Sequence, residues 1–247
     1  MNNMMKKILL FSAALLGMSV VSNAEVKMPS VFCDNMVIQR DTKAAVWGSA
    51  ASGSKVTVKA GWTDEKVEVK ADRAGKWKTS IQTPAAGGPY EISISDGTGE
   101  PLVLKNVLSG DVWFCSGQSN MQMPVMGYLC QPMYGSTEAL LEAPSFAGSV
   151  RLFCTPRTLP EDHTPDLDTK WEVCSASSAA PFSAIGYFFA TKLSKALGVP
   201  VGMIENDWGG TRIQAWMSEK AVRSVEENPD EGDWINKTAF LWRTRVE

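Results

Sequence analysis

From Val26 to about Val107 the chain alternates apolar and polar residues, which is the pattern of half-buried β-strands. The clearest segments are 44–48, 55–59, 66–70 and 90–94. Turn-forming residues occupy 51–53, 72–75, 87–89 and 96–97. Short strands at this spacing are typical of an antiparallel β-sandwich. We therefore expect a sandwich over residues 25–107, with a structural or substrate-shaping role.

After Leu108 the pattern changes to apolar runs that alternate with helical periodicity. Strands are expected at 112–115, 150–154 and 199–204, and helices at 136–142, 183–197 and 218–227. The helix at 183–197 has lysines late in its sequence and Gly198 directly after it, as a helix C-terminus requires. A helix followed by a second apolar strand indicates a βαβ arrangement with parallel strands. The expected fold class is α/β, with the sandwich followed by a second domain over 108–247.

Residues 1–24 have the features of a secretory signal peptide. Lys6 and Lys7 precede the apolar run 8–21, and Ser22-Asn23-Ala24 offers a cleavage site of small residues. We therefore expect a secreted or periplasmic protein. The remaining sequence contains no apolar run of about 18 residues, so we expect no membrane span after cleavage.

Charge and cysteine usage narrow the classes of partner. The net charge of −3 comes from interspersed signs, so no basic face for nucleic acid or membrane is expected. None of the five cysteines has Cys-x-x-Cys spacing, and no metal is expected. Because export allows disulfides, Cys130 could pair with Cys154 or Cys174. Cys115 lies in an apolar run and is expected to pack as a small hydrophobic residue.

The candidate chemistry begins where the apolar run 112–115 ends. A Ser-Gly turn follows, and then Ser119, flanked by Gln118 and Asn120. Sheets of α/β proteins bind their ligands just beyond the C-terminal ends of parallel strands. Ser119 is therefore the candidate nucleophile, and a polar turn without chemistry is the alternative interpretation.

A second candidate element, Gly209-Gly210, follows the apolar strand expected at 199–204. Ester hydrolysis by a serine needs hydrogen-bond donors for the tetrahedral oxyanion. The backbone N–H of Ser119 would be one donor. The N–H of Gly209 or Gly210 is the natural second, because glycine lets the main chain approach a ligand closely. The alternative is a tight turn with no ligand.

The catalytic base is harder to find, because His163 is the only histidine of the chain. One interpretation is a triad of Ser119, His163 and either Asp166 or Asp162. The other is a solvated histidine in an acidic, proline-containing loop, and this setting favours the second interpretation.

Two motifs resemble one enzyme family. Residues 115–121 (Cys-Ser-Gly-Gln-Ser-Asn-Met) resemble the nucleophile block of sialate O-acetylesterases, members of the wider SGNH/GDSL hydrolase group. Residues 208–211 and 213–216 (Trp-Gly-Gly-Thr and Ile-Gln-Ala-Trp) resemble the glycine loop of the same family. Further likeness lies in 75–77, 87–91 and 182–202.

The resemblance implies that 108–247 is a partial SGNH-type, flavodoxin-like three-layer domain with Ser119 as its catalytic residue. Oxyanion or substrate binding is assigned to Gly209, Gly210, Gln118 and Asn120. In similar esterases the base comes from an Asp-x-His element that follows a Trp-Tyr-Gln-Gly-Glu block, and neither occurs here. The tail 238–247 also differs from the family sequence. We therefore expect a chain truncated at its C-terminus, without its base and with an unpaired sheet edge.

The implied function is a carbohydrate O-acetyl esterase that works through an acetyl-enzyme and needs no cofactor. Its substrate would be an acetylated sugar or glycan, with O-acetylated sialic acid favoured by the resemblance and acetylxylan-type polysaccharide as the alternative. A non-catalytic carbohydrate-binding protein that uses Trp62 and Trp77 is a second hypothesis, although large aromatic residues on strands usually fill the core. A third is the defective product of a frameshifted or clipped gene.

Overall fold

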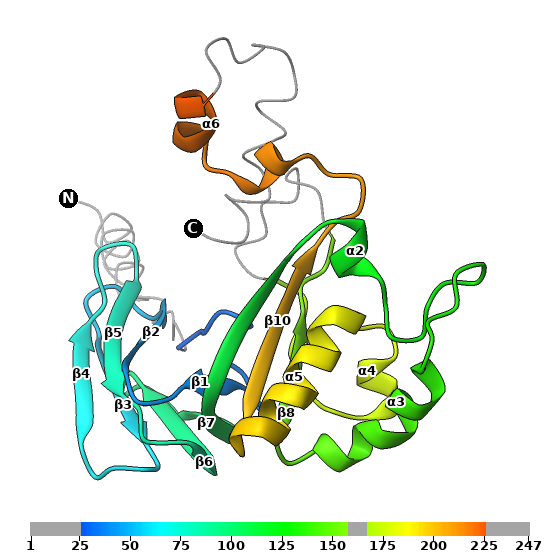
Figure 1. Cartoon of the computed structure of the whole chain (residues 1–247). Coiled ribbons are helices and arrows are strands. Elements are labelled where there is room, and N and C mark those ends of the chain that lie inside the picture. Colours follow the sequence, from blue (N-terminus) through cyan, green and yellow to red (C-terminus); the bar gives the residue numbers. More distant parts are fainter. Residues whose placement is uncertain (1–25, 158–166, 226–247) are drawn as a thin grey trace, which may run out of the picture.

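The computed structural model describes residues 26–157 and 167–225 (Figure 1). The predicted signal peptide, the tail 238–247, His163 and its neighbours Asp162 and Asp166 lie outside these ranges. Within the ranges, no helix is long and apolar enough to cross a membrane.

The N-terminal half consists of two antiparallel sheets that share one core. Strands β3, β4 and β6 extend one sheet from β7, and β2 pairs with β5 in the other. The strands are β1 (Val37–Gln39), β2 (Lys43–Ser49), β3 (Lys55–Ala60), β4 (Lys66–Lys70), β5 (Lys76–Gln82), β6 (Gly87–Ser95) and β7 (Leu102–Gly117). Val46, Trp77 and Ile94 come from both sheets and lie in the same buried cluster. The strands expected from alternation are thus confirmed, whereas the turn expected at 87–89 is wrong, because these residues begin β6.

The C-terminal half is built on parallel strands. β10 (Val201–Asp207) lies between β7 and β8 (Val150–Cys154), parallel to both, and β9 (Trp171–Val173) adds an antiparallel edge. The remaining elements are α2 (Ser119–Gln122), α3 (Ser136–Glu142), the 3₁₀ helix Ala143–Phe146, α4 (Ala176–Ala179), α5 (Ala184–Leu197), the 3₁₀ helix Ile213–Trp216 and α6 (Glu219–Val225). The mixed α/β class is confirmed.

One helix fixes the packing of this half. The N-cap Ser183 accepts a hydrogen bond from Gly186 N–H at 3.2 Å, and Gly198 ends α5 with a φ of 64°. The buried face of α5, which includes Tyr187 and Ala190, packs with α3 and α4 over β8 and β10. Among the described residues the helices that pack on the parallel strands lie on this one face, so the three-layer arrangement stays a prediction.

Strand β7 joins the two halves. It runs for 16 residues, far beyond the run 112–115 that the sequence indicates. Its first part pairs with β6 and with β1, and its second part pairs with β10. The predicted boundary between residues 107 and 108 therefore falls inside one continuous strand, and the division into two domains stays a prediction.

Candidate active site

The two predicted loops meet because two parallel strands end in register. Asp207 of β10 lies opposite Gly117 of β7, and Trp208 N–H continues the ladder by donating to Gly117 O at 3.1 Å. The chain beyond β7 turns into α2, which begins at Ser119. The serine and the glycine loop therefore stand side by side at the rim of the sheet, above α5 in Figure 1.

Ser119 is exposed, as are its neighbours Gln118 and Asn120. The amide oxygen Oε1 of Gln118 caps the helix: it accepts the Ser119 N–H at 3.3 Å and the Ser119 hydroxyl at 3.1 Å. An amide oxygen can hold a hydroxyl proton but cannot remove it. Gln118 therefore orients the serine in this state and does not activate it.

Gly209 touches the helix that carries the serine. A Cβ atom at Gly209 would lie 3.5 Å from Ser119 Cα and 2.7 Å from Oε1 of Gln122. A side chain at this position would displace the Gln122 amide, whereas glycine lets the loop lie directly against the helix.

The backbone N–H groups of Gly209 and Gly210, the two candidate oxyanion donors of the loop, differ in whether they are already hydrogen-bonded. Gly209 N–H already donates to Gln122 Oε1 at 2.5 Å, so it does not point to an empty oxyanion position. Gly210 follows with a φ of 78°, and its N–H has no acceptor among the residues that the structure describes. Sequence reasoning left Gly209 and Gly210 as equal candidates and overlooked Gln122, whose position one helical turn after Ser119 was the available signal.

A buried charge cluster, which sequence reasoning missed, supports the strand below the glycine loop. Glu205 and Asp207 are 1% and 3% exposed. Arg157 bridges them: its Nη2 lies 3.2 Å from Glu205 Oε1, and its Nε lies 3.0 Å from Asp207 Oδ1. The Ser183 N–H donates to Glu205 Oε2 at 2.8 Å. The available signal was two acids inside an otherwise apolar strand.

The cluster perturbs the titration of its neighbours. Burial raises the pKa of Glu205 to about 8, and the Asp207 carboxylate adds to the rise, although the Ser183 N–H and Arg157 oppose it. Burial also raises the pKa of the Cys115 thiol to about 11. The Cys154 residue is exposed overall, but desolvation of its thiol and the nearby Glu205 carboxylate raise the pKa of that thiol to about 12. Neither cysteine is a thiolate near neutral pH, so Ser119 remains the candidate nucleophile of this region.

The cysteines form no disulfide. The bridge considered between Cys130 and Cys154 or Cys174 is not formed, because Cys130 is exposed, Cys174 is buried under the helical layer, and Cys154 is a free thiol at the end of β8. Cys115 packs against the helical layer, with Sγ 3.4 Å from where a Cβ of Gly186 would lie, so its expected packing is confirmed.

The exposed row of Trp62 and Trp77 that the carbohydrate-binding hypothesis requires is not formed. Trp77 is 3% exposed and belongs to the sandwich core. Trp62 packs edge-on against Tyr90, with ring centroids 5.3 Å apart, and donates its Nε1–H to Gln82 O. These two residues fill and brace the sandwich, as aromatic strand residues usually do.

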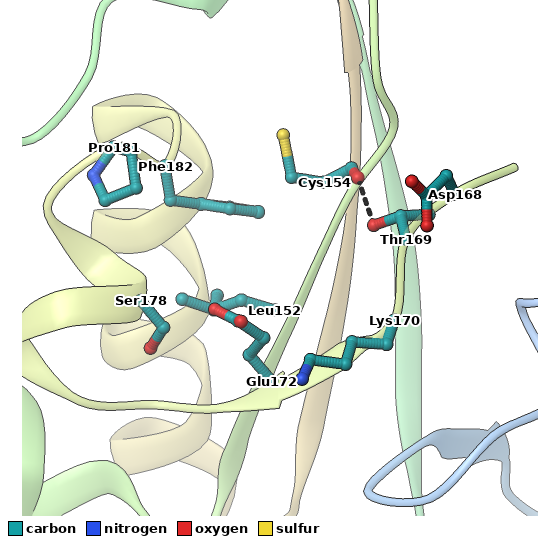
Figure 2. Close-up of a pocket in the computed structure, with 9 residues that line it drawn as sticks. All are labelled: Leu152, Cys154, Asp168, Thr169, Lys170, Glu172, Ser178, Pro181 and Phe182. Atoms are coloured by element: carbon teal, nitrogen blue, oxygen red, sulfur yellow. Dashed lines mark hydrogen bonds between the residues drawn. The ribbon is translucent and has the colours of Figure 1, made fainter.

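A separate cavity of about 460 Å³ lies between β8, the segment before β9 and α4 (Figure 2). Its wall includes Lys170, Glu172 and Phe182, and Thr169 Oγ1 donates to Cys154 O at 2.6 Å across it. None of the predicted site residues lines this cavity. The described ranges also contain no group of three or more His, Cys, Asp or Glu residues that could hold a metal ion.

Comparison with a solved structure defines the class of protein. The model superposes on the crystal structure of a carbohydrate acetylesterase from Xanthomonas citri with a TM-score of 0.75 and 29% identity, covering 90% of this chain and 47% of that one. No family model matches the sequence. The chain therefore has the fold of the carbohydrate acetylesterases.

The sequence comparison is more specific. The chain is 31% identical to sialate O-acetylesterase of Rattus norvegicus over 210 residues, which are 78% of this chain and 38% of the relative. It is 30% identical to sialate O-acetylesterase of Homo sapiens over 215 residues, covering 80% and 40%. The chain is thus similar to the sialate O-acetylesterases, as the motifs predict, and it spans about two fifths of the length of these curated relatives.

Proposed function

We propose that this chain provides the nucleophile and the oxyanion donors of a carbohydrate O-acetyl esterase. The observation that carries the proposal is the meeting of Ser119 and the Gly209–Gly210 loop at the paired ends of β7 and β10. The hydroxyl is exposed at a sheet rim, where a substrate can reach it. The names of the relatives and of the structural neighbour support the same chemistry.

The proposed reaction has two steps. The Ser119 oxygen attacks the acetyl carbon while a base takes its proton, and the tetrahedral oxyanion accepts hydrogen bonds from the N–H groups of Ser119 and Gly210. The intermediate collapses, the sugar oxygen leaves with the proton, and water then hydrolyses the acetyl-enzyme. The side chain of Gln118 must turn away first, because its amide oxygen occupies both the hydroxyl and the N–H of Ser119.

The base in this proposal comes from outside the described residues, because the described ranges contain no histidine. Glu205 and Asp207 do not serve, since their carboxyl groups are buried and engaged with Arg157. A serine hydrolase without its base loses on the order of 10⁶ in turnover, because the triad acts as a unit. We therefore expect weak activity from the chain alone.

The proposed substrate is an O-acetylated sialic acid, in keeping with the names of the curated relatives. Acetylated plant polysaccharide of the xylan type remains the enzymatic alternative, because the chemistry at Ser119 is the same for both. The proposed location is outside the cytoplasm, either secreted or periplasmic, on the strength of the leader sequence.

The test is acetate release from p-nitrophenyl acetate, followed by O-acetylated sialic acid and acetylated xylan, with the purified mature chain. We expect slow turnover that Ser119→Ala abolishes. The matched control is Ser80→Ala, an exposed serine of β5 in the sandwich, which should leave the rate unchanged.

Two further outcomes sharpen the result. Turnover that survives Ser119→Ala would remove the serine mechanism. Turnover that is robust and lost in His163→Ala would identify His163 as the base and overturn the view that the base comes from another part of the fold.

A further inference from the structure

A groove of about 1320 Å³ opens beside the sandwich, and none of the candidate site residues lines it. Its wall is built from the segment 26–35, the end of β2, the start of β5, the start of β7 and residues 170–171. Strands β2 and β5 are paired and lie next to each other in Figure 1. Pockets for drug-sized ligands measure about 300–1,000 Å³, so this groove has room for several linked sugar rings.

The segment 26–35, which forms one wall of the groove, is tied to both halves of the molecule. Lys27 N–H donates to Ser49 O at 2.9 Å, and Ser49 N–H donates to Lys27 O at 2.8 Å, which fixes the segment along β2. Further along, Val31 O accepts the Trp171 Nε1–H at 2.9 Å, which fixes it to the start of β9. A wall that is already held in place loses little conformational freedom when a ligand binds.

One aromatic ring of the groove is open to solvent. Trp47 is 40% exposed, whereas Val46 and Trp77 of the same two strands point into the sandwich core. Phe32 packs edge-on against the Trp47 ring, with centroids 4.6 Å apart, and so supports it from the segment 26–35. An open, supported indole offers a flat apolar surface, on which the C–H groups of a sugar ring can be removed from water.

Three exposed lysines, Lys27, Lys76 and Lys78, line the same groove. In the β2–β5 register Lys78 is directly opposite Trp47, so the two side chains share one face of the sheet with Cβ atoms about 5 Å apart. Within residues 26–157 and 167–225, none of the three lysines has an ion-pair partner. Lys170 also borders the groove, but Figure 2 shows its ammonium group turned toward the other cavity.

The acids that line the groove do not compensate these lysines. Asp34 and Asp72 each accept a backbone N–H through Oδ1, at 2.7 and 2.8 Å. On the other sheet of the sandwich, by contrast, Glu68 forms ion pairs with both Lys55 and Lys66, at 3.1 and 3.4 Å. The net charge of the whole chain is −3, so the positive charge is local to the groove. The groove is therefore complementary to an anionic ligand.

We propose that this groove is a second carbohydrate-binding site, which holds an oligosaccharide that bears carboxylate groups. One sugar ring packs on Trp47, and the ammonium groups of Lys76 and Lys78 bind a carboxylate by charge-assisted hydrogen bonds. Binding here keeps an acidic glycan close to the molecule that carries Ser119. The choice of a sugar as the ligand rests on the proposed function, whereas the open ring and the uncompensated cations do not.

The test measures binding to the Ser119→Ala form of the purified mature chain, so that turnover does not interfere. Isothermal titration calorimetry compares three probes of equal length: a sialic acid tetramer, a galacturonic acid tetramer and neutral xylotetraose. We expect at least one acidic tetramer to bind at least about tenfold more tightly than xylotetraose, because only the acidic probes can pair with the lysines. The difference should shrink in high salt.

Variants of the groove separate the ring from the charges. Trp47→Ala should weaken binding of the acidic tetramer at least about tenfold, and Trp47→Phe, which keeps a ring, should retain most of the affinity. Lys78→Glu reverses one charge at an exposed position and should weaken the acidic tetramer by a similar factor. This variant keeps the inference testable if Trp47→Ala does not fold. The control is Lys59→Ala, an exposed lysine of β3 outside the groove, which should change nothing.

Two results would overturn the inference directly. One is equal affinity for the acidic and the neutral tetramers. The other is acidic binding that Lys78→Glu and Trp47→Ala leave unchanged, because the ligand would then lie elsewhere. Tighter binding of a single-stranded oligothymidylate than of either acidic tetramer would also overturn it, since the groove would then be a general polyanion site. A preference for one acidic tetramer over the other would support the inference and identify which carboxylate sugar is bound.

Binding and turnover can fail separately. Groove-dependent binding in a chain whose unsubstituted form releases no acetate would support the groove and count against the proposed function. Ser119-dependent acetate release without binding of any tetramer would leave the proposed function standing and overturn the groove. In either case Trp47→Ala should leave the release of acetate from p-nitrophenyl acetate unchanged, because Trp47 lies outside the candidate active site.

Discussion

In strand β7 the less apolar part is the more deeply buried one. Residues 107–110 (Val-Leu-Ser-Gly) are all buried, including the polar Ser109, whose Oγ donates to Pro84 O. Residues 112–115 (Val-Trp-Phe-Cys) are more apolar, yet Trp113 and Phe114 are almost half exposed. The first part has neighbours on both edges, β6 and β1, whereas within residues 26–157 and 167–225 the second part pairs with β10 alone. Burial in this strand therefore follows the number of neighbouring strands.

The largest effect is expected from a substitution at Gly110, where the two parts of β7 meet. A Cβ at Gly110 would lie 2.2 Å from Pro200 O, a backbone atom that cannot move without shifting the start of β10. We expect Gly110→Ala to cost more than about 3 kcal/mol and to prevent stable folding. Urea denaturation followed by circular dichroism measures this. Gly148→Ala, with no atom within 4 Å of its added Cβ, is the control and should change little.

A pH series tests the same difference between the two parts of β7, because in the part of the chain that the structure describes only the second part lies beside a buried acid. Glu205 of β10 is opposite Cys115. Its pKa is raised from 4.5 to about 8, so the folded state keeps a proton that the unfolded state releases, and stability falls as the pH rises between these values. We expect a loss on the order of 3 kcal/mol between about pH 5 and about pH 8.

Unfolding in urea at the two pH values measures this loss, and Glu205→Gln should flatten it. Glu142→Gln is the control, since Glu142 is an exposed partner of Lys195 and should keep the slope. Amide exchange should accelerate at Cys115 more than at Val107 at the higher pH. An unchanged slope in Glu205→Gln would show that another group titrates.

The third prediction compares one residue from each part of the strand. Leu104 is 4% exposed between two sheets, so Leu104→Ala should cost about 2–3 kcal/mol. Phe114 is larger but 48% exposed, and Phe114→Ala should cost less than about 1 kcal/mol. The free energy of unfolding of the two variants tests the order. A larger loss for Phe114→Ala would mean that its ring is covered in solution.

Local signals made some elements predictable from the sequence to within a residue. The strand at 150–154 and the helix at 136–142 have the predicted bounds, because their periodicity is decided by residues close in the chain. Ser183 and Gly198 likewise fixed the ends of α5. The first part of β7 was missed, since Asn106 and Ser109 interrupt its pattern and long-range pairing overrides propensity.

The site was predictable only in outline. Ser119 and the glycine pair stood out as polar and glycine residues after apolar strands, and the structure brings them together. The hydrogen bond from Gly209 to Gln122 and the placement of Arg157 between Glu205 and Asp207 depend on the approach of distant segments, which spacing in one sequence does not reveal. The same contact is the reason that the N–H of Gly209 is already bonded.

The hydrogen bond from Trp208 to Gly117 has a consequence for how such a protein can evolve. It joins the strand that precedes the serine and the strand that precedes the glycine loop through main chain alone. Exposed side chains at the ends of the two strands can be replaced without removing either partner of this main-chain bond. Substitutions in the surrounding loops can therefore change the surface around Ser119 while the main chain keeps the serine and the glycine loop side by side.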